Sequence, residues 1–213
     1  MATYCLSKCF PWQGPLSDRA ARLCRMFGLT MDRLADRVVM HQCRLEVNAG
    51  DIVYIMGPSG AGKSVLLREL EQAVPPEKSV NLAHIPVPGD RSVIDCFDGP
   101  LVASLRLLSA MGLSEVFCLL NRPRNLSDGQ KYRFRLAQAL ASGKPFIFAD
   151  EFSNELDRVT AATVAFNVHK FAKRTGTTFV LASCHEDILL DLAPDVLVIK
   201  DFSGPAEVIY RNH

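Results

Sequence analysis

The strongest constraint on the fold of this chain is a glycine-rich loop between an apolar run and a helical pattern. The loop fits the phosphate-binding pattern G-x-x-x-x-G-K-[ST] at every fixed position: Gly57-Pro58-Ser59-Gly60-Ala61-Gly62-Lys63-Ser64. Residues 51–56 before it predict a buried strand, and residues 65–73 after it predict a helix that ends before Pro75. The loop therefore has the strand-to-helix setting that phosphate binding requires.

The residue types of the loop explain how it would hold a nucleotide. Small residues let backbone N–H groups close around phosphates, and the helix N-terminus adds a positive dipole. Lys63 can then reach the β- and γ-phosphates, and the Ser64 hydroxyl can bind Mg²⁺. We therefore predict ATP contacts from Gly57 through Val65. The alternative, a chance match in a glycine-rich turn, is disfavoured by the flanking elements.

Composition narrows the class of protein. The 213 residues are 48% hydrophobic, enough for one core with a small inserted subdomain. The chain has 24 basic and 23 acidic residues, so its net charge does not favour binding to nucleic acid or to an anionic membrane. Seven cysteines without a framework spacing favour reduced thiols and a cytoplasmic protein. Cys5 and Cys9 lack the second pair or nearby histidine of a metal site. No apolar run approaches the ~20 residues that span a bilayer, and residues 1–40 lack a signal-peptide layout.

The order of elements predicts an α/β fold, namely a P-loop NTPase core with a mainly parallel sheet. Residues 1–40 are expected to form an irregular to helical extension, with a helix over 17–27. The fold is also expected to include an N-terminal antiparallel β element. Residues 41–91 and 144–213 form the core, and residues 92–143 form a short helical subdomain. Strands are expected at 41–47, 80–87, 145–149, 177–182, 196–199 and 206–210, and further helices at 101–111, 113–120, 128–141 and 157–174.

Two acidic residues end the apolar strand at 146–149. Carboxylates at the end of a buried strand are costly unless they serve a cation or a reaction. In phosphate-loop NTPases an aspartate here holds Mg²⁺, which assigns Asp150, and Glu151 can act as the general base for the attacking water. A plain strand exit with solvated acids is the alternative, and the phosphate loop upstream disfavours it.

A second helix start lies inside the helical subdomain. Ser127 suits an N-cap and Asp128 suits the first turn of the helix that follows. Gly129 would let a phosphate approach the helix N-terminus, with Ser127 as a ligand. The simpler reading is a well-capped helix and nothing more.

In its ordered motifs, the chain resembles the ATP-binding-cassette (ABC) ATPase family over about residues 41–200. Leu126 to Gln130 matches the family signature, usually LSGGQ, and Asp150-Glu151 matches its magnesium aspartate and catalytic glutamate. The stretch 154–157 resembles the loop that crosses the dimer interface, usually SALD, through Asn154, Leu156 and Asp157. His185 matches the switch histidine that contacts the γ-phosphate.

The resemblance implies a head-to-tail homodimer with ATP and Mg²⁺ between the two chains. The signature residues Ser127, Asp128, Gly129 and Gln130 would then serve the partner's nucleotide. Hydrolysis would weaken the dimer that the charged ligand holds together. A single chain is therefore expected to be a poor ATPase.

The sequence departs from the family pattern at three places. No glutamine follows the strand near residue 87, so Asp90 is the substitute candidate for sensing Mg²⁺. The helical subdomain is short, and Phe152 stands where transporter subunits have proline. For the aromatic that stacks on adenine the choice is Phe27, because Tyr4 and Trp12 lie further upstream.

These departures favour a soluble ABC ATPase over a transporter motor, similar to the domains found fused to a predicted GNAT acetyltransferase, acting here with a separate partner protein. An ATP-binding subunit of a membrane ABC transporter is the main alternative, without direct membrane insertion. A third reading is an ATP-dependent regulatory or nucleic-acid-associated dimerisation module, which a basic cluster around the signature supports weakly: Arg122, Arg124, Lys131, Arg133 and Arg135.

Overall fold

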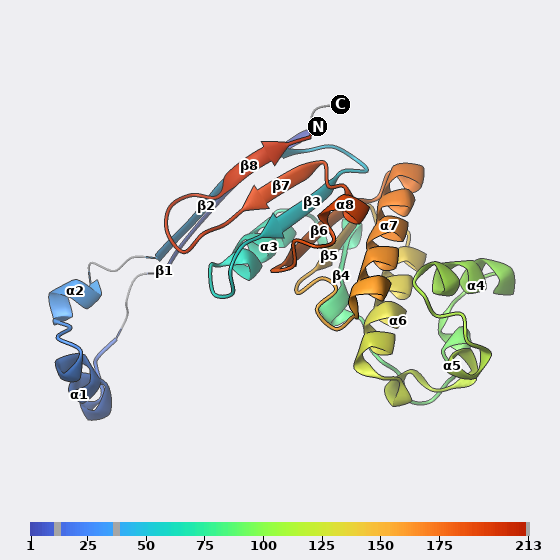
Figure 1. Ribbon diagram of the computed structural model, residues 1–213, viewed down its shortest axis with the longest axis horizontal. Coiled ribbons are helices and arrows are strands. Elements are labelled where there is room, and N and C mark those ends of the chain that lie inside the picture. The colour runs from blue at the N-terminus through green and yellow to red at the C-terminus, as the bar shows by residue number, and fades with distance from the viewer. Residues whose placement is uncertain (11–13, 36–38, 212–213) are drawn as a thin grey trace.

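The computed structural model describes residues 1–10, 14–35 and 39–211 (Figure 1). Its centre is a six-stranded sheet in the order β4-β5-β6-β3-β7-β8, in which only the β7–β8 pairing is antiparallel. The strands are β3 (Ile52–Met56), β4 (Ser79–Asn81), β5 (Phe146–Ala149), β6 (Thr178–Ser183), β7 (Val196–Ile199) and β8 (Glu207–Tyr210). The predicted P-loop NTPase fold with a mainly parallel sheet is confirmed.

The central strands are buried along their whole length because both faces of the sheet are covered. All residues of β3 and β6 are buried, as expected for parallel strands between two layers. One face packs against α3 (Lys63–Gln72) through Leu66, Leu67 and Leu70. The other face packs against α6 (Asp128–Ala141) and α7 (Arg158–Thr175), with α8 (Leu189–Leu192) beside α7. The phosphate loop therefore sits where β3 leaves the core for α3.

The N-terminal region contains a strand that the sequence reading missed. β1 (Ala2–Phe10) pairs antiparallel with β2 (Val39–Val47), from Ala2 opposite Val47 to Phe10 opposite Val39. The expectation of an irregular to helical start is wrong for this part, because polar residues on the exposed face hide the strand pattern. The helix expected at 17–27 is confirmed as α1 (Asp18–Met26), capped by Ser17, and α2 (Met31–Ala35) follows. Trp12 lies outside the described residues.

The helical subdomain is built from α4 (Leu101–Ala110), α5 (Val116–Leu120) and α6. The second of these is shorter than the expected 113–120, because Gly112 ends α4 with a positive φ of 78° and α5 begins only at Val116. The expected strand over 80–87 is wrong beyond residue 81. There the Asn81 side chain accepts a hydrogen bond from the Ala83 amide at 3.0 Å and starts a 3-10 turn, Leu82–His84.

Within the described ranges, no helix combines the length and the apolar character needed to cross a bilayer.

Candidate functional site

The backbone of the phosphate loop takes conformations that only glycine adopts without strain. Gly57 has φ 145° and Gly62, the N-cap of α3, has φ 98°. A Cβ on Gly57 would lie 2.0 Å from the backbone oxygen of Lys200, in the segment after β7. A Cβ on Gly62 would lie 2.1 Å from His41 Cε1 on β2. These two neighbours fix where the loop runs, so the glycines are required by packing as well as by φ.

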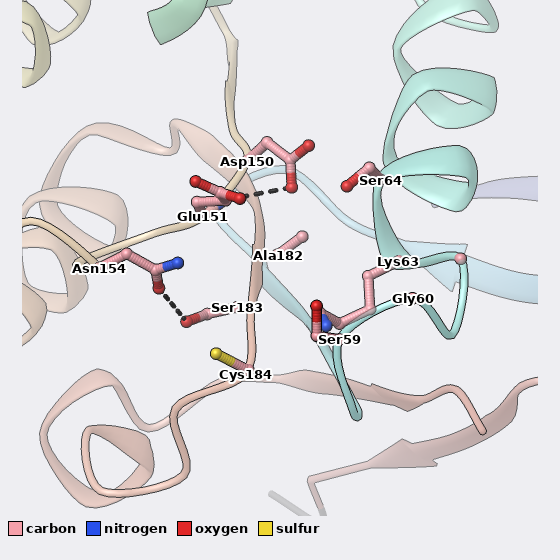
Figure 2. Close-up of a pocket in the computed structure, with 11 residues that line it drawn as sticks. Ser59, Gly60, Lys63, Ser64, Asp150, Glu151, Asn154, Ala182, Ser183 and Cys184 are labelled. Atoms are coloured by element: carbon pink, nitrogen blue, oxygen red, sulfur yellow. Dashed lines mark hydrogen bonds between the residues drawn. The ribbon is translucent and has the colours of Figure 1, made fainter. Parts of the chain in front are cut away.

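The loop opens into a cavity of about 240 Å³ that two strand ends complete. Lys63 donates to the backbone oxygens of Gly57 at 2.8 Å and Pro58 at 2.9 Å, so its ammonium is held over the loop. Figure 2 shows the loop residues on one side and the ends of β5 and β6 on the other. The lining residues are Ser59, Gly60, Gly62, Lys63, Ser64, Asp150, Glu151, Asn154, Ala182, Ser183 and Cys184.

The acidic pair stands at a strained turn after β5. Glu151 has φ 51° and Ser153 has φ 66°, conformations that non-glycine residues rarely adopt. The Phe152 amide donates to the Ala182 oxygen at 2.8 Å, which ties the turn to β6, and the Phe152 side chain is fully buried. The Glu151 amide donates to Asp150 Oδ1 at 3.1 Å (Figure 2). The turn is therefore held by the core in the orientation that presents both carboxylates to the cavity.

A buried tyrosine supports the same turn from α6. The Ser153 amide donates to the Tyr132 hydroxyl at 3.2 Å, and burial raises the pKa of that hydroxyl above its usual range. Tyr132→Phe removes the acceptor and leaves a buried N–H unpaired, which costs about 1–3 kcal/mol. We expect this loss in the free energy of unfolding from urea denaturation, together with slower ATP hydrolysis. Wild-type stability in the variant would contradict this role for Tyr132.

The end of β6 links the acidic turn to His185. Ser183 Oγ donates to Asn154 Oδ1 at 3.2 Å and accepts from the His185 amide at 3.2 Å. Tyr54 on β3 donates to the His185 backbone oxygen at 2.5 Å, and burial raises the pKa of Tyr54 to about 12, so its hydroxyl stays protonated. The His185 side chain is 46% exposed, lies 3.9 Å from Asp187, and does not line the cavity. Its backbone is therefore fixed, while its imidazole lies outside the cavity lining.

Ser64 and Asp150 fit a Mg²⁺ ion that also binds nucleotide phosphates. Both line the cavity, and Figure 2 shows the hydroxyl and the carboxylate facing each other across it. Mg²⁺ prefers such hard oxygen ligands and keeps several of its waters. Asp90 is not brought there, because its carboxylate is exposed and pairs with Arg91 at 3.6 Å. No group of three or more His, Cys, Asp or Glu side chains suited to a metal occurs in the described part of the chain.

The four signature residues lie outside the cavity, at the exposed start of α6. Ser127 and Gln130 form a capping box, in which each side chain bonds the other's backbone amide at 3.3 and 3.0 Å. Asp128 is exposed and pairs with Lys131 at 3.2 Å. A Cβ on Gly129 would lie 2.8 Å from the Glu155 backbone oxygen, so this glycine packs on the loop before α7. The capped N-terminus of α6 therefore does not line the chain's own nucleotide cavity.

The loop at 154–157 has a clear local role in the chain itself. Asp157 is the N-cap of α7 and accepts from the amides of Val159 at 3.1 Å and Thr160 at 3.0 Å. Bonds from the Thr160 hydroxyl and amide lower the pKa of Asp157. The carboxylate therefore supports α7 above its unfolded pKa and loses that effect as pH falls through its folded pKa. Leu156 is half-buried near Gly129.

The structure brings a different aromatic residue near the phosphate loop from the one the sequence suggested. Phe27 follows α1, is 71% exposed and does not line the cavity. Phe10, at the end of β1, packs edge-on against His41 with ring centroids 5.8 Å apart, and His41 covers Gly62. Burial, and then the charge of Lys200, lower the pKa of His41, so the ring is neutral at neutral pH. The pairing of β1 with β2 places Phe10 beside His41. A sequence analysis that does not predict β1 therefore cannot find this contact.

The basic cluster around the signature is partly engaged inside the chain. Arg133 donates to the backbone oxygens of Gly112 at 2.7 Å and Gly129 at 3.1 Å. Lys131 pairs with Asp128, and the Arg124 side chain packs against Gly89. These contacts stabilise the helical subdomain within the chain, and they do not support a nucleic-acid partner.

The fold and the cavity define a phosphate-loop NTPase. Residues 40–91 match the sequence model of a family described as ABC transporter. The aliphatic sulfonates import ATP-binding protein SsuB 1 of Paracoccus denitrificans is 29% identical over 84% of this chain and 78% of that protein. The methionine import ATP-binding protein MetN of Nocardia farcinica is 26% identical over 78% of this chain and 60% of that protein.

Solved structures agree on the fold. The ATP-binding cassette MJ0796, in a dimeric post-hydrolysis state bound to ADP and Pi, superposes with a TM-score of 0.66 at 19% identity, covering 84% of this chain and 94% of that one. In sequence and in fold the chain is similar to ATP-binding cassette domains of ABC transporters, and it is an ATPase.

Proposed function

We propose that this chain is the ATP-binding subunit of a membrane transporter and works as an ATP-dependent homodimer. The observation that carries the ATPase part is that Lys63, Ser64, Asp150 and Glu151 line one cavity. The transport part is supported by the relatives, whose names describe import ATP-binding proteins. They favour this alternative over the soluble, GNAT-associated reading that the sequence departures suggested.

The chemistry at the site follows from where the side chains lie. The loop amides and Lys63 bind the β- and γ-phosphates and spread their charge. Mg²⁺, held by Ser64 and Asp150, would neutralise charge that develops on the phosphate oxygens. Glu151 orients and deprotonates the water, and His185 swings toward the γ-phosphate to stabilise the transition state. Phe10, which packs on His41 beside the phosphate loop, would contact the base in place of Phe27.

The dimer part rests on the separation of the signature from the cavity. Ser127 and Gly129 end a capped helix whose N-terminus suits an anion. That end does not border the chain's own phosphate cavity. A second chain, turned head to tail, would place its signature over the first chain's ATP. The MJ0796 cassette, described as dimeric with ADP and Pi, supports this arrangement.

The membrane partner would dock on the helical subdomain, at the cytoplasmic face of the membrane. Five large apolar side chains on α4 and α5 are more than half exposed, which is unusual for a surface without a partner. They are Leu101 at 61%, Val102 at 58%, Val116 at 62%, Phe117 at 81% and Leu120 at 65%. Together they offer an apolar surface for a partner subunit to cover.

Phe117→Ser tests this docking surface. We expect the variant to fold and bind ATP as wild type, because the side chain is exposed. In a pull-down of the Glu151→Gln form with ATP, a polytopic membrane protein should be retained, and Phe117→Ser should reduce its recovery more than about tenfold. Leu190→Ser, at a residue 92% exposed on α8, is the matched control. Recovery of only soluble partners, or equal recovery with Phe117→Ser, would contradict the transporter reading.

A further inference from the structure

Residues 14–35, here called the 14–35 segment, carry large apolar side chains that the other described parts of the chain leave exposed. The segment holds α1 and α2 between the two strands of the β1–β2 pair, and Figure 1 shows both helices apart from the six-stranded sheet. No residue of α1 is buried. The large exposed side chains are Leu23 at 56%, Met26 at 81%, Phe27 at 71%, Leu29 at 41% and Met31 at 53%. Five such residues within nine positions form a continuous stretch rather than scattered exposures.

The two sides of α1 differ in chemistry. At the helical rotation of about 100° per residue, Leu23 falls with Ala20 and Cys24 on one side. Arg19, Arg22 and Arg25 fall on the opposite side. The helix is therefore amphipathic, yet neither side is packed against the core. An amphipathic helix that buries nothing within its own chain is suited to bind something else.

The polar side is cationic. The segment contains four arginines and two aspartates, so it adds two positive charges to a chain that is otherwise nearly neutral. Among the described residues, none of its arginines forms an ion pair or donates a side-chain hydrogen bond. Their charge is therefore available to an anionic partner.

We propose that the 14–35 segment binds the surface of an anionic lipid bilayer. Arginines on one side of a short helix, with leucine on the other and methionine and phenylalanine at its C-terminal end, resemble the pattern of helices that lie at the headgroup boundary. Guanidinium groups then contact lipid phosphates while the apolar side chains enter the acyl region. A nucleic acid would satisfy the arginines but leave the apolar side chains without a partner. A second copy of the chain would bring the same cationic side against itself.

Vesicle flotation with the full-length chain tests the proposal in the absence of any membrane protein. Wild type should float with vesicles of phosphatidylcholine mixed with phosphatidylglycerol and not with phosphatidylcholine alone. Changing Arg19, Arg22 and Arg25 together to serine should weaken binding by about a hundredfold, since each arginine contributes near an anionic surface. Changing Leu23, Met26 and Leu29 together to serine should weaken it at least about tenfold.

The control is a double variant, Arg106→Ser with Leu190→Ser, which changes an exposed arginine and an exposed leucine outside the segment. It should float as wild type does. Thermal unfolding of each variant checks that the fold is kept. The proposal is overturned if wild type does not float with anionic vesicles or if both segment variants float as wild type. It is also overturned if sedimentation shows the segment instead pairing two copies of the chain. These outcomes do not depend on ATP hydrolysis or on a permease, so they test the segment apart from the proposed function.

Discussion

Glu151→Gln is expected to slow ATP hydrolysis by about 10²–10⁴-fold while leaving ATP binding intact, because it removes the general base and keeps the size of the side chain. Glu151 lines the cavity, and its turn is tied to β6 through Phe152, so the amide should occupy the same place as the carboxylate. Bound ATP then persists, and the dimer that it holds together should accumulate. Single-turnover hydrolysis and size-exclusion chromatography with ATP measure the two effects.

The matched control for this change is Glu77→Gln, at an exposed position in the turn before β4. It should hydrolyse ATP at the wild-type rate and show no trapped dimer. If wild type and Glu151→Gln accumulate the same ATP-bound dimer, the chain is a regulatory dimerisation module with little turnover. If neither dimerises with ATP, the proposed subunit arrangement is wrong.

Gly57→Ala should be the most damaging single methyl addition in the phosphate loop. The new Cβ would lie 2.0 Å from the Lys200 backbone oxygen, which has little freedom to move because the Lys200 amide donates to the Met56 oxygen at 2.9 Å. Steric overlap and the unfavourable φ of 145° together cost roughly 3 kcal/mol or more. We expect reduced stability in urea and loss of binding to a fluorescent ATP analogue.

Gly143→Ala separates the two causes of that loss. Gly143 also has a positive φ, 64°, but nothing lies within 4 Å of the Cβ it would gain. The variant should lose only the free energy of unfolding that comes from the unfavourable φ, about 1–2 kcal/mol. It should bind ATP as wild type does. Equal losses in the two variants would mean that the contact with Lys200 does not constrain the loop.

The sequence indicates which loop and acidic residues line the cavity, because these residues follow directly after strands. The apolar runs before Gly57 and Asp150 are core strands, buried except at Phe146, and both end at the same edge of a parallel sheet. Ser127 and Asp157 are residue types that favour the N-cap of a helix, and both form the expected cap hydrogen bonds at the start of long helices. Such features depend on few neighbours in sequence.

The parts that the sequence misses depend on distant partners. β1 is identified only by its pairing with β2, about forty residues away, because its alternating side chains are polar on one face and mixed on the other. The strained turn at Glu151 and Ser153 depends on Phe152, Ala182 and Tyr132, which come from three elements. The contact of His41 with Gly62 needs β2 and the loop in register. None of these is encoded in a local pattern.

The most direct test of the central claim, that each ATP site needs the signature of a second chain, is a mixture of two inactive variants. Lys63→Ala removes the phosphate contact and Ser127→Arg blocks the signature, so each variant alone should be inactive. In an equal mixture, half of the dimers pair the two chains, and each such dimer holds one intact site. ATPase activity should therefore return to about a quarter of the wild-type value. No recovery on mixing, or full activity in a strictly monomeric wild-type preparation, would contradict the account.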